Sequence, residues 1–253
     1  MSARYSGPMT PAFPVRAITL DLDDTLWPIA PLIGKAEAAL DAWLRAHAPR
    51  TAARWPMPAM RALRDRIARE HPHLAHDFTT QRLLSLREAL RDAGDDEALA
   101  EGAFEAFFSA RCDVVHYDDT IAALERLAAR VPLAGLSNGN ACLERVGVMH
   151  LFDFQLGARE HGAAKPDPGI FLAACTRLGI APAQVLHVGD DIEMDVVGAH
   201  GAGLRSCWLA RDDHADAPRA WPHPDLRPDI TVSTLTALAD WLDANALQDT
   251  AAA

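Results

Sequence analysis

Short apolar runs alternate with amphipathic patterns along the second half of the chain. One clear helical pattern lies in residues 167–180, "DPGIFLAACTRLGI", where apolar positions follow the i, i+3, i+4, i+7 spacing of one helix face. The apolar runs read as buried strands and occupy residues 17–20, 131–136, 154–156, 185–188 and 204–209. This alternation predicts an α/β fold with a Rossmann-like, doubly wound parallel sheet and crossover helices.

The interval between Trp27 and Tyr117 breaks the alternation. It has no convincing strand but several amphipathic helical stripes: Leu40, Trp43, Leu44 and His47; Leu83, Leu86 and Leu90; Phe104, Phe107 and Phe108. The pattern predicts an all-helical domain inserted after the first strand. We therefore expect an α/β core at residues 15–27 and 117–245, a helical cap at 28–116, and flexible termini at 1–14 and 246–253.

Composition narrows the classes of partner. Lysine and arginine number 24 against 35 aspartates and glutamates, and the resulting net charge of −11 disfavours nucleic acid and anionic membranes. Four widely separated cysteines form no CxxC pair, which favours reduced thiols over structural zinc or disulfides. With no signal-like segment and no long apolar run, we expect a soluble, cytoplasmic protein, monomeric or homodimeric.

Polar side chains follow the predicted strands where each strand ends. In "AITLDLDDTLW", residues 17–27, three carboxylates follow an apolar run, and Ser137, Asp190 and Asp191 follow later runs. In open parallel sheets the carboxyl ends of the strands form the ligand-binding edge. Lys165 lies in the loop after the third run and can reach the same edge.

Several acids and one lysine at one place repel one another unless a cation joins them. A hard divalent ion with oxygen ligands, most simply Mg²⁺, supplies that compensation. Magnesium held by few protein carboxylates usually serves phosphate chemistry, because it offsets charge on a phosphoryl group.

Four short motifs in order resemble those of the haloacid dehalogenase superfamily of phosphohydrolases. They are "DLDDT" at residues 21–25, Ser137 at a strand end, Lys165 in "KPDP", and the acidic "GDDIEMD" at residues 189–195. The resemblance extends from about residue 15 to 243 and includes the position of the helical cap. It implies a Mg²⁺-dependent phosphomonoester phosphatase that uses an aspartyl-phosphate intermediate.

The resemblance also implies a role for each matching residue. Asp21 matches the nucleophile, and Asp23 matches the general acid and base. Ser137 and the amide of Asn138 match groups that hold phosphate oxygens. Lys165 matches the cation that offsets charge on the nucleophile and the phosphoryl group.

The metal ligands implied by the resemblance are Asp21, Asp190 and the backbone carbonyl of Asp23. Asp191 and Asp195 match acids in the metal's outer shell, and Thr25 matches a position that stabilises the turn after the nucleophile.

Asp23 separates phosphoester chemistry from dehalogenation, because dehalogenases of this pattern lack an acid two residues after the nucleophile. The wider pattern looks most like bacterial phosphatases of FMN and of 5-amino-6-(5-phosphoribitylamino)uracil. A nucleotide or sugar phosphatase and a phosphomutase stay open as alternatives. Two alternatives from other classes are a phosphoaspartate signalling protein and a catalytically idle binding protein.

Several residues have competing interpretations. The stretch "HDFTTQR" is interpreted as a part of the cap that faces the active site through His76, Asp77 and Arg82. Two alternatives are a second metal site and a group of surface polar side chains, in either case formed by His71, His73, His76 and Asp77. Trp27 could line the substrate entrance and stack on a planar group, or pack as a hinge residue. Ser137 could cap a following helix as well as hold phosphate.

Overall fold

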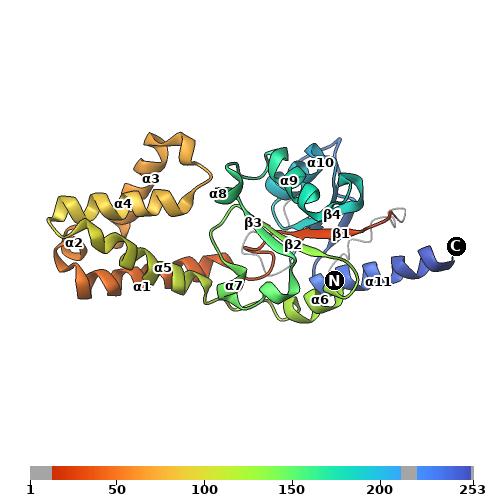
Figure 1. Ribbon diagram of the computed structural model, residues 1–253, viewed down its shortest axis with the longest axis horizontal. Coiled ribbons are helices and arrows are strands. Elements are labelled where there is room, and N and C mark those ends of the chain that lie inside the picture. The colour runs from red at the N-terminus through yellow and green to blue at the C-terminus, as the bar shows by residue number, and fades with distance from the viewer. Residues whose placement is uncertain (1–12, 212–220, 252–253) are drawn as a thin grey trace.

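The four residues of β1 (Ala17–Leu20) are all buried, and this strand lies inside a parallel sheet. The computed structural model describes residues 13–211 and 221–251, and the strand order is β3-β2-β1-β4-β5-β6 (Figure 1). The other strands are β2 (Leu133–Ser137), β3 (Phe154–Gly157), β4 (Val185–Gly189), β5 (Arg205–Leu209) and β6 (Ile230–Val232). The predicted doubly wound parallel sheet is confirmed.

The order of the strands reverses beside β1. The chain runs from β1 outward through β2 and β3, then returns to pair β4 with the other side of β1 and continues outward to β6. Loops that leave β1 and β4 therefore diverge at the carboxyl edge of the sheet. Such a switch point is where open α/β sheets bind ligands.

Helices cover both faces of the sheet. One buried apolar cluster joins the sheet to α6 (Thr120–Ala128), α7 (Leu143–Val146) and α11 (Leu235–Ala251). A second cluster joins it to α9 (Pro168–Leu178) and α10 (Gly198–Gly201). The connections also contain α8 (Ala158–His161), the π-helix η5 (Ile192–Val197) and the 3-10 turns η3 (Met149–Leu151) and η4 (Pro182–Gln184).

The residues between β1 and α6 form a separate group of helices at one end of the molecule (Figure 1). These are α1 (Ile29–His47), α2 (Pro49–Arg54), α3 (Met57–Glu70), α4 (Phe78–Ala93) and α5 (Ala100–Cys112), with 3-10 turns η1 (Pro72–Leu74) and η2 (Glu97–Leu99). They bury an apolar cluster of their own, which includes Leu44, Leu86 and Phe107. We call residues 29–112 the helical cap.

The predicted helix in residues 167–180 is present as α9. Asp167 accepts a hydrogen bond from the backbone N–H of Gly169 at the start of the helix. Gly179 ends the helix with φ of 68°, in the left-handed region that favours glycine.

Two features go beyond the sequence prediction. Residues 246–251, part of the terminus that the sequence analysis expected to be flexible, have helical backbone and continue α11; the stretch "NALQDTA" contains no glycine or proline to end the helix. β6 was not predicted because its three residues follow a proline-rich loop and are too short for a recognisable alternation. Most of the expected N-terminal lead, residues 1–12, lies outside the described residues, whereas Phe13 packs against Trp241.

Within residues 13–211 and 221–251, no helix combines the length and apolarity that crossing a membrane requires.

Neighbouring positions on α9 offer a test of the packing against the sheet. Ile170 is fully buried, whereas Leu172 is 42% exposed. We expect Ile170→Ala to lower the free energy of unfolding by about 2–5 kcal/mol, and Leu172→Ala by less than about 1 kcal/mol. Urea unfolding followed by circular dichroism measures both. Equal losses would show that α9 does not bury the Ile170 face as described.

Candidate active site

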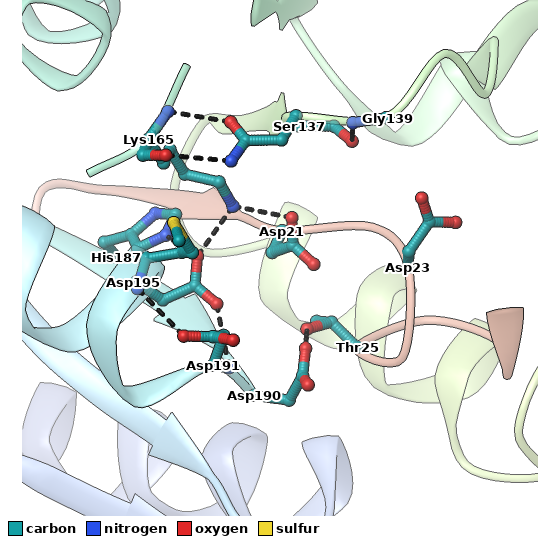
Figure 2. Close-up of polar contacts among 12 residues, drawn as sticks. Asp21, Asp23, Thr25, Ser137, Gly139, Lys165, His187, Asp190, Asp191 and Asp195 are labelled. Atoms are coloured by element: carbon teal, nitrogen blue, oxygen red, sulfur yellow. Dashed lines mark hydrogen bonds and ion pairs between the residues drawn. The ribbon is translucent and has the colours of Figure 1, made fainter. Parts of the chain in front are cut away.

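Asp21 lies at the carboxyl end of the central strand β1. Its backbone N–H donates to the carbonyl of Val188 in β4, so the residue is held where the two strands diverge. Its carboxylate is buried and accepts a hydrogen bond of 2.6 Å from Nζ of Lys165. The same Nζ donates to Oδ1 of Asp195, also at 2.6 Å (Figure 2). One buried ammonium group therefore joins two buried carboxylates.

The Lys165 loop is fixed by Asn138. The side-chain amide of Asn138 donates to the carbonyl of Lys165 at 2.9 Å, and its oxygen accepts from the backbone N–H of Lys165 at 2.7 Å. These two bonds tie the loop after β2 to the loop that carries the lysine. Asn138 thus positions Lys165, a role that the sequence did not predict.

A third carboxylate, that of Asp190, joins the two that contact Lys165. Oxygens of Asp21, Asp190 and Asp195 lie within 4.8 Å of one another. Thr25 donates from its hydroxyl to Oδ1 of Asp190 at 3.1 Å, and Nε1 of Trp208 donates to the Asp190 carbonyl at 3.0 Å. Oxygen ligands from carboxylates are what a hard divalent cation prefers, so this group fits Mg²⁺.

Both carboxylate oxygens of Asp195 have partners within the site. Its Oδ1 contacts Lys165 and lies 3.0 Å from Nε2 of His187, while its Oδ2 accepts from the backbone N–H of Asp191. A Cβ on Gly189 would overlap the Asp195 carboxylate, so only glycine fits there. The resemblance implies that Asp195 lies in the metal's outer shell, and the structure places its carboxylate within the buried three-acid group.

Asp191 is turned toward the helix that follows it. Its Oδ1 accepts hydrogen bonds from the backbone N–H groups of Glu193 and Met194 and caps η5. This capping accounts for an acid at the start of a helix without a metal. Asp191 is not among the three acids of the cluster.

Burial and mutual repulsion disturb the ionisation of the cluster. Burial raises the pKa of Asp21 to about 7, with repulsion from Asp195 adding to it and Lys165 offsetting part. Burial likewise raises the pKa of Asp190 to about 8, helped by the charge of Asp21. Burial also opposes ionisation of Asp195, but Lys165 and His187 outweigh it and hold the pKa low. Three acids with one lysine therefore need protons or a further cation.

His187 of β4 contacts the Asp195 carboxylate. The ring is buried between Oγ1 of Thr19, 2.9 Å from Nδ1, and Oδ1 of Asp195. Burial lowers the pKa of His187, which favours the neutral ring. The sequence analysis did not single out His187, although a histidine inside an otherwise apolar strand is a recognisable signal.

The Asp23 carboxylate lies apart from the three-acid group (Figure 2). It accepts hydrogen bonds from Nη2 of Arg111, 2.6 Å from both carboxylate oxygens, and from Nε1 of Trp27 at 2.9 Å. Trp27 is fully buried and packs edge-on against His116. The structure thus shows Trp27 as a packed residue, with no exposed ring surface on which a substrate could stack.

The sequence analysis missed Arg111. It belongs to the buried side of α5, four residues after Phe107, and is itself only 1% exposed. A charge that continues an apolar helix face is the available signal, but its partner is 88 positions away in sequence and cannot be read from spacing.

Ser137 ends β2 and is buried. Its hydroxyl accepts a hydrogen bond from the backbone N–H of Gly139 at 3.0 Å, which closes a turn (Figure 2). The next helix, α7, begins only at Leu143. Ser137 is therefore not the N-cap of that helix, contrary to the alternative considered above.

The first turn of α4 lies against the core. Asp77 caps this helix by accepting from the N–H and hydroxyl of Thr80, and it forms an ion pair of 3.2 Å with Arg159 of α8. Burial raises the pKa of Asp77, but these bonds and the charge of Arg159 outweigh it, so the pKa is lowered. Nearby, Nδ2 of Asn140 reaches Oγ1 of Thr79 at 3.5 Å.

The other cap candidates are placed differently. The guanidinium of Arg82 stacks 3.5 Å from the centre of the Phe107 ring inside the cap, and burial lowers its pKa to about 9. His76 is half-buried beside Asp77. Among the described residues, the aspartate cluster is the one group of three or more acids, histidines and cysteines close enough for a metal, so His71, His73 and His76 form no such site.

Comparison with known sequences agrees with the resemblance that the four motifs indicate. Residues 15–203 match the family of haloacid dehalogenase-like hydrolases. The chain is 32% identical over 230 residues to the Escherichia coli (strain K12) 5-amino-6-(5-phospho-D-ribitylamino)uracil phosphatase YigB, covering 88% of this chain and 94% of that protein. It is 38% identical over 147 residues to a phosphoserine phosphatase from Thermus thermophilus, covering 56% of this chain and 58% of that protein.

Solved structures share the fold over almost the whole length. A crystal structure described as a 2-haloacid dehalogenase from Pseudomonas syringae pv. Tomato DC3000 superposes with a TM-score of 0.83 and 36% identity, covering 91% of this chain and 99% of that chain. A phosphatase of the same superfamily from Thermococcus onnurineus superposes with a TM-score of 0.60 and 24% identity, covering 90% of this chain and 98% of that chain.

Removal of one acid tests the cluster as a cation site. We expect Asp190→Asn to stabilise the metal-free protein at pH 8 by about 1 kcal/mol or more, because the raised pKa shows that the fold disfavours this ionised carboxyl. Magnesium at about 100 times its dissociation constant should stabilise the wild type by about 2.7 kcal/mol. It should add little to the variant.

Thermal unfolding in EDTA and in Mg²⁺ measures both effects. Asp191→Asn is the matched control, because it removes the adjacent charge but leaves the three-acid cluster intact. That variant should keep the magnesium response. An equal response in Asp190→Asn would exclude Asp190 as a ligand.

Proposed function

Because the chain belongs to the haloacid dehalogenase-like hydrolase family, we propose that it is a magnesium-dependent phosphatase that acts through an aspartyl-phosphate intermediate on a small phosphorylated metabolite. Its named phosphatase relatives place it among the phosphoric monoester hydrolases. The observation that carries the mechanism is the buried Lys165 ammonium between Asp21 and Asp195, at the edge of the sheet where Asp190 also lies.

Asp21 is the proposed nucleophile. One of its oxygens attacks phosphorus, the bond from phosphorus to the alcohol oxygen breaks, and an acyl phosphate forms on Asp21. Water then attacks this phosphorus, which releases inorganic phosphate and restores the carboxylate. Lys165 favours the ionised form of the nucleophile against the effect of burial and offsets the negative charge of the arriving phosphate.

Ser137 and the backbone amide of Asn138 are the proposed donors to the phosphoryl oxygens. Both belong to the turn after β2, next to Asp21 across the β1–β2 pair. A divalent cation held by Asp21, Asp190 and the carbonyl of Asp23 would, when bound, supply charge compensation to the phosphoryl group. Asp195 and His187 keep Lys165 and the acids in place.

Asp23 is the proposed general acid and base. It would give a proton to the leaving alcohol oxygen and later accept one from the attacking water. Dehalogenation of a 2-halo acid is a second candidate function, which the structural similarity at 36% identity to a protein described as a 2-haloacid dehalogenase favours. A halide leaving group needs no proton, so the acid at position 23 favours the phosphoester.

For the substrate we propose FMN or a ribityl-pyrimidine phosphate. The support is the 32% identity, over most of both chains, to an enzyme named for such a ribitylaminouracil phosphate. Nucleotide and sugar phosphates are the alternatives within the same chemistry. These substrates are cytoplasmic metabolites, so we propose the same location for the protein.

Phosphate release across a substrate panel tests the proposal directly. The panel contains FMN, a ribityl-pyrimidine phosphate, nucleotides, sugar phosphates, an aryl phosphate and, for halide release, a 2-chloro acid, each with Mg²⁺ or EDTA. We expect magnesium-dependent phosphate release with the highest kcat/KM for the flavin or pyrimidine ester. Halide release without phosphate release would favour the dehalogenase alternative.

Two neighbouring aspartates distinguish the nucleophile from local charge. Asp21→Asn should lower kcat by at least about 10⁴-fold, because an amide cannot form the acyl phosphate. Asp24→Asn removes the same charge three residues away, at a residue whose Oδ1 caps α1 through the N–H of Ile29, and should keep kcat within about threefold. Steady-state kinetics at saturating Mg²⁺ measures both. Substantial turnover by Asp21→Asn would overturn the assignment.

A further inference from the structure

The two chain connections between core and cap meet at Asp23. Trp27, in the outgoing connection before α1, donates its Nε1–H to Oδ1 of Asp23. Arg111, in the last turn of α5 before the chain returns, donates from Nη2 to both carboxylate oxygens. One side chain from the outgoing connection and one from the last turn of the cap therefore hold the same carboxylate.

The charge of Arg111 lies in an unusually buried position. Its side chain is 2% exposed, and the Asp23 carboxylate is its ion-pair partner. Nη1 is buried without a hydrogen-bond partner among the described residues. A buried ion pair contributes little net stability, because desolvation of the two charges offsets their attraction. What it does supply is a fixed geometry for the paired carboxylate.

Gly139 lies close to the Asp23 carboxylate and leaves it little room to move. A Cβ on Gly139 would lie 2.5 Å from Oδ2 of Asp23, 3.3 Å from Oγ of Ser137 and 3.4 Å from Nη2 of Arg111. The carboxylate thus sits between the guanidinium and the turn that carries Ser137. A glycine is needed there because any side chain would displace Asp23 or its partners.

The cap itself is held against the core at a second point. Asp77 and Thr79 in the first turn of α4 contact Arg159 and Asn140 of the core. Helix α4 packs on α5, where Arg82 stacks on Phe107, one helical turn before Arg111. The placement of α4 on the core is therefore connected through packed side chains to the guanidinium that holds Asp23.

We propose that Arg111 is a positioning residue for Asp23, through which the seating of the cap on the core sets the orientation of the general acid and base. The inference rests on the proposed function. Arg111 acts through the Asp23 carboxylate and not by contact with the substrate. The effect of Arg111 on kcat should therefore be larger for esters whose leaving group needs a proton more.

Leaving-group dependence is the readout that a merely structural role would not produce. General acid catalysis contributes about 10²–10⁴-fold to rate, and poor leaving groups depend on it most. We expect Arg111→Met to lower kcat about 10–100-fold with an alkyl phosphate, about fivefold or less with an aryl phosphate, and to change KM less than about threefold. Arg111→Lys should restore part of the loss with the alkyl ester.

A double mutant tests whether Arg111 acts through Asp23. In an Asp23→Asn background, Arg111→Met should change kcat with the alkyl phosphate less than about threefold, in place of the loss of about 10–100-fold expected in the wild-type background, because the group it positions is already gone. Multiplicative losses in the double mutant, or equal losses with both classes of ester, would overturn the proposal.

Arg61→Met is the matched control, because Arg61 pairs with the buried carboxylate of Glu37 within the cap. It should show no leaving-group dependence. Circular dichroism and thermal unfolding report whether each variant folds. If Arg111→Met does not fold, Arg111→Lys takes its place, and equal losses with both classes of ester in that variant would overturn the proposal.

Failure of this inference can be told apart from failure of the proposed function. If Asp21→Asn keeps phosphatase activity, the catalytic assignment itself is wrong. If Asp21→Asn is inactive and Asp23→Asn loses alkyl esters selectively, but Arg111→Met behaves like the wild type, only the role of Arg111 is rejected.

Discussion

The buried ion pairs of Lys165 are the interaction on which the active-site edge depends. Two carboxylates at 2.6 Å from one ammonium, all of them buried, are stable only in combination, because an isolated buried charge is costly. Asn138 fixes the lysine backbone, His187 and Gly189 fix Asp195, and β1 fixes Asp21. Each of these residues holds one member of the charged group in place, and they lie at or near the ends of strands β1, β2 and β4.

Within this arrangement the acids divide into two environments. Asp21, Asp190 and Asp195 share a buried cluster that suits a cation, whereas the Asp23 carboxylate has an arginine and a tryptophan as partners. Two carboxylates only two residues apart thus experience different charges. Different environments for neighbouring acids are how one site accommodates separate chemical roles.

Local patterns predicted most of the fold but only part of the site. Apolar runs identified β1 to β5, and four short motifs identified Asp21, Asp23, Ser137, Lys165 and Asp190, because each motif directly follows a strand. Arg111 and His187 were missed, since their importance comes from partners distant in sequence. Trp27 could be judged only from burial, and the length of α11 only from the backbone, because residues at a chain end carry few packing constraints.

The separate apolar cluster of the helical cap also bears on folding cooperativity. It shares no residue with the two clusters that pack on the sheet. Leu32 of α1 packs in the first of these sheet clusters, and polar contacts such as Asp77 with Arg159 and Asp23 with Arg111 also join the two parts. Such contacts couple two units less strongly than a shared apolar core does. We therefore expect the cap to open at lower free energy than the sheet unfolds, so that amide exchange is faster in α2 to α4 than in β1 and β4.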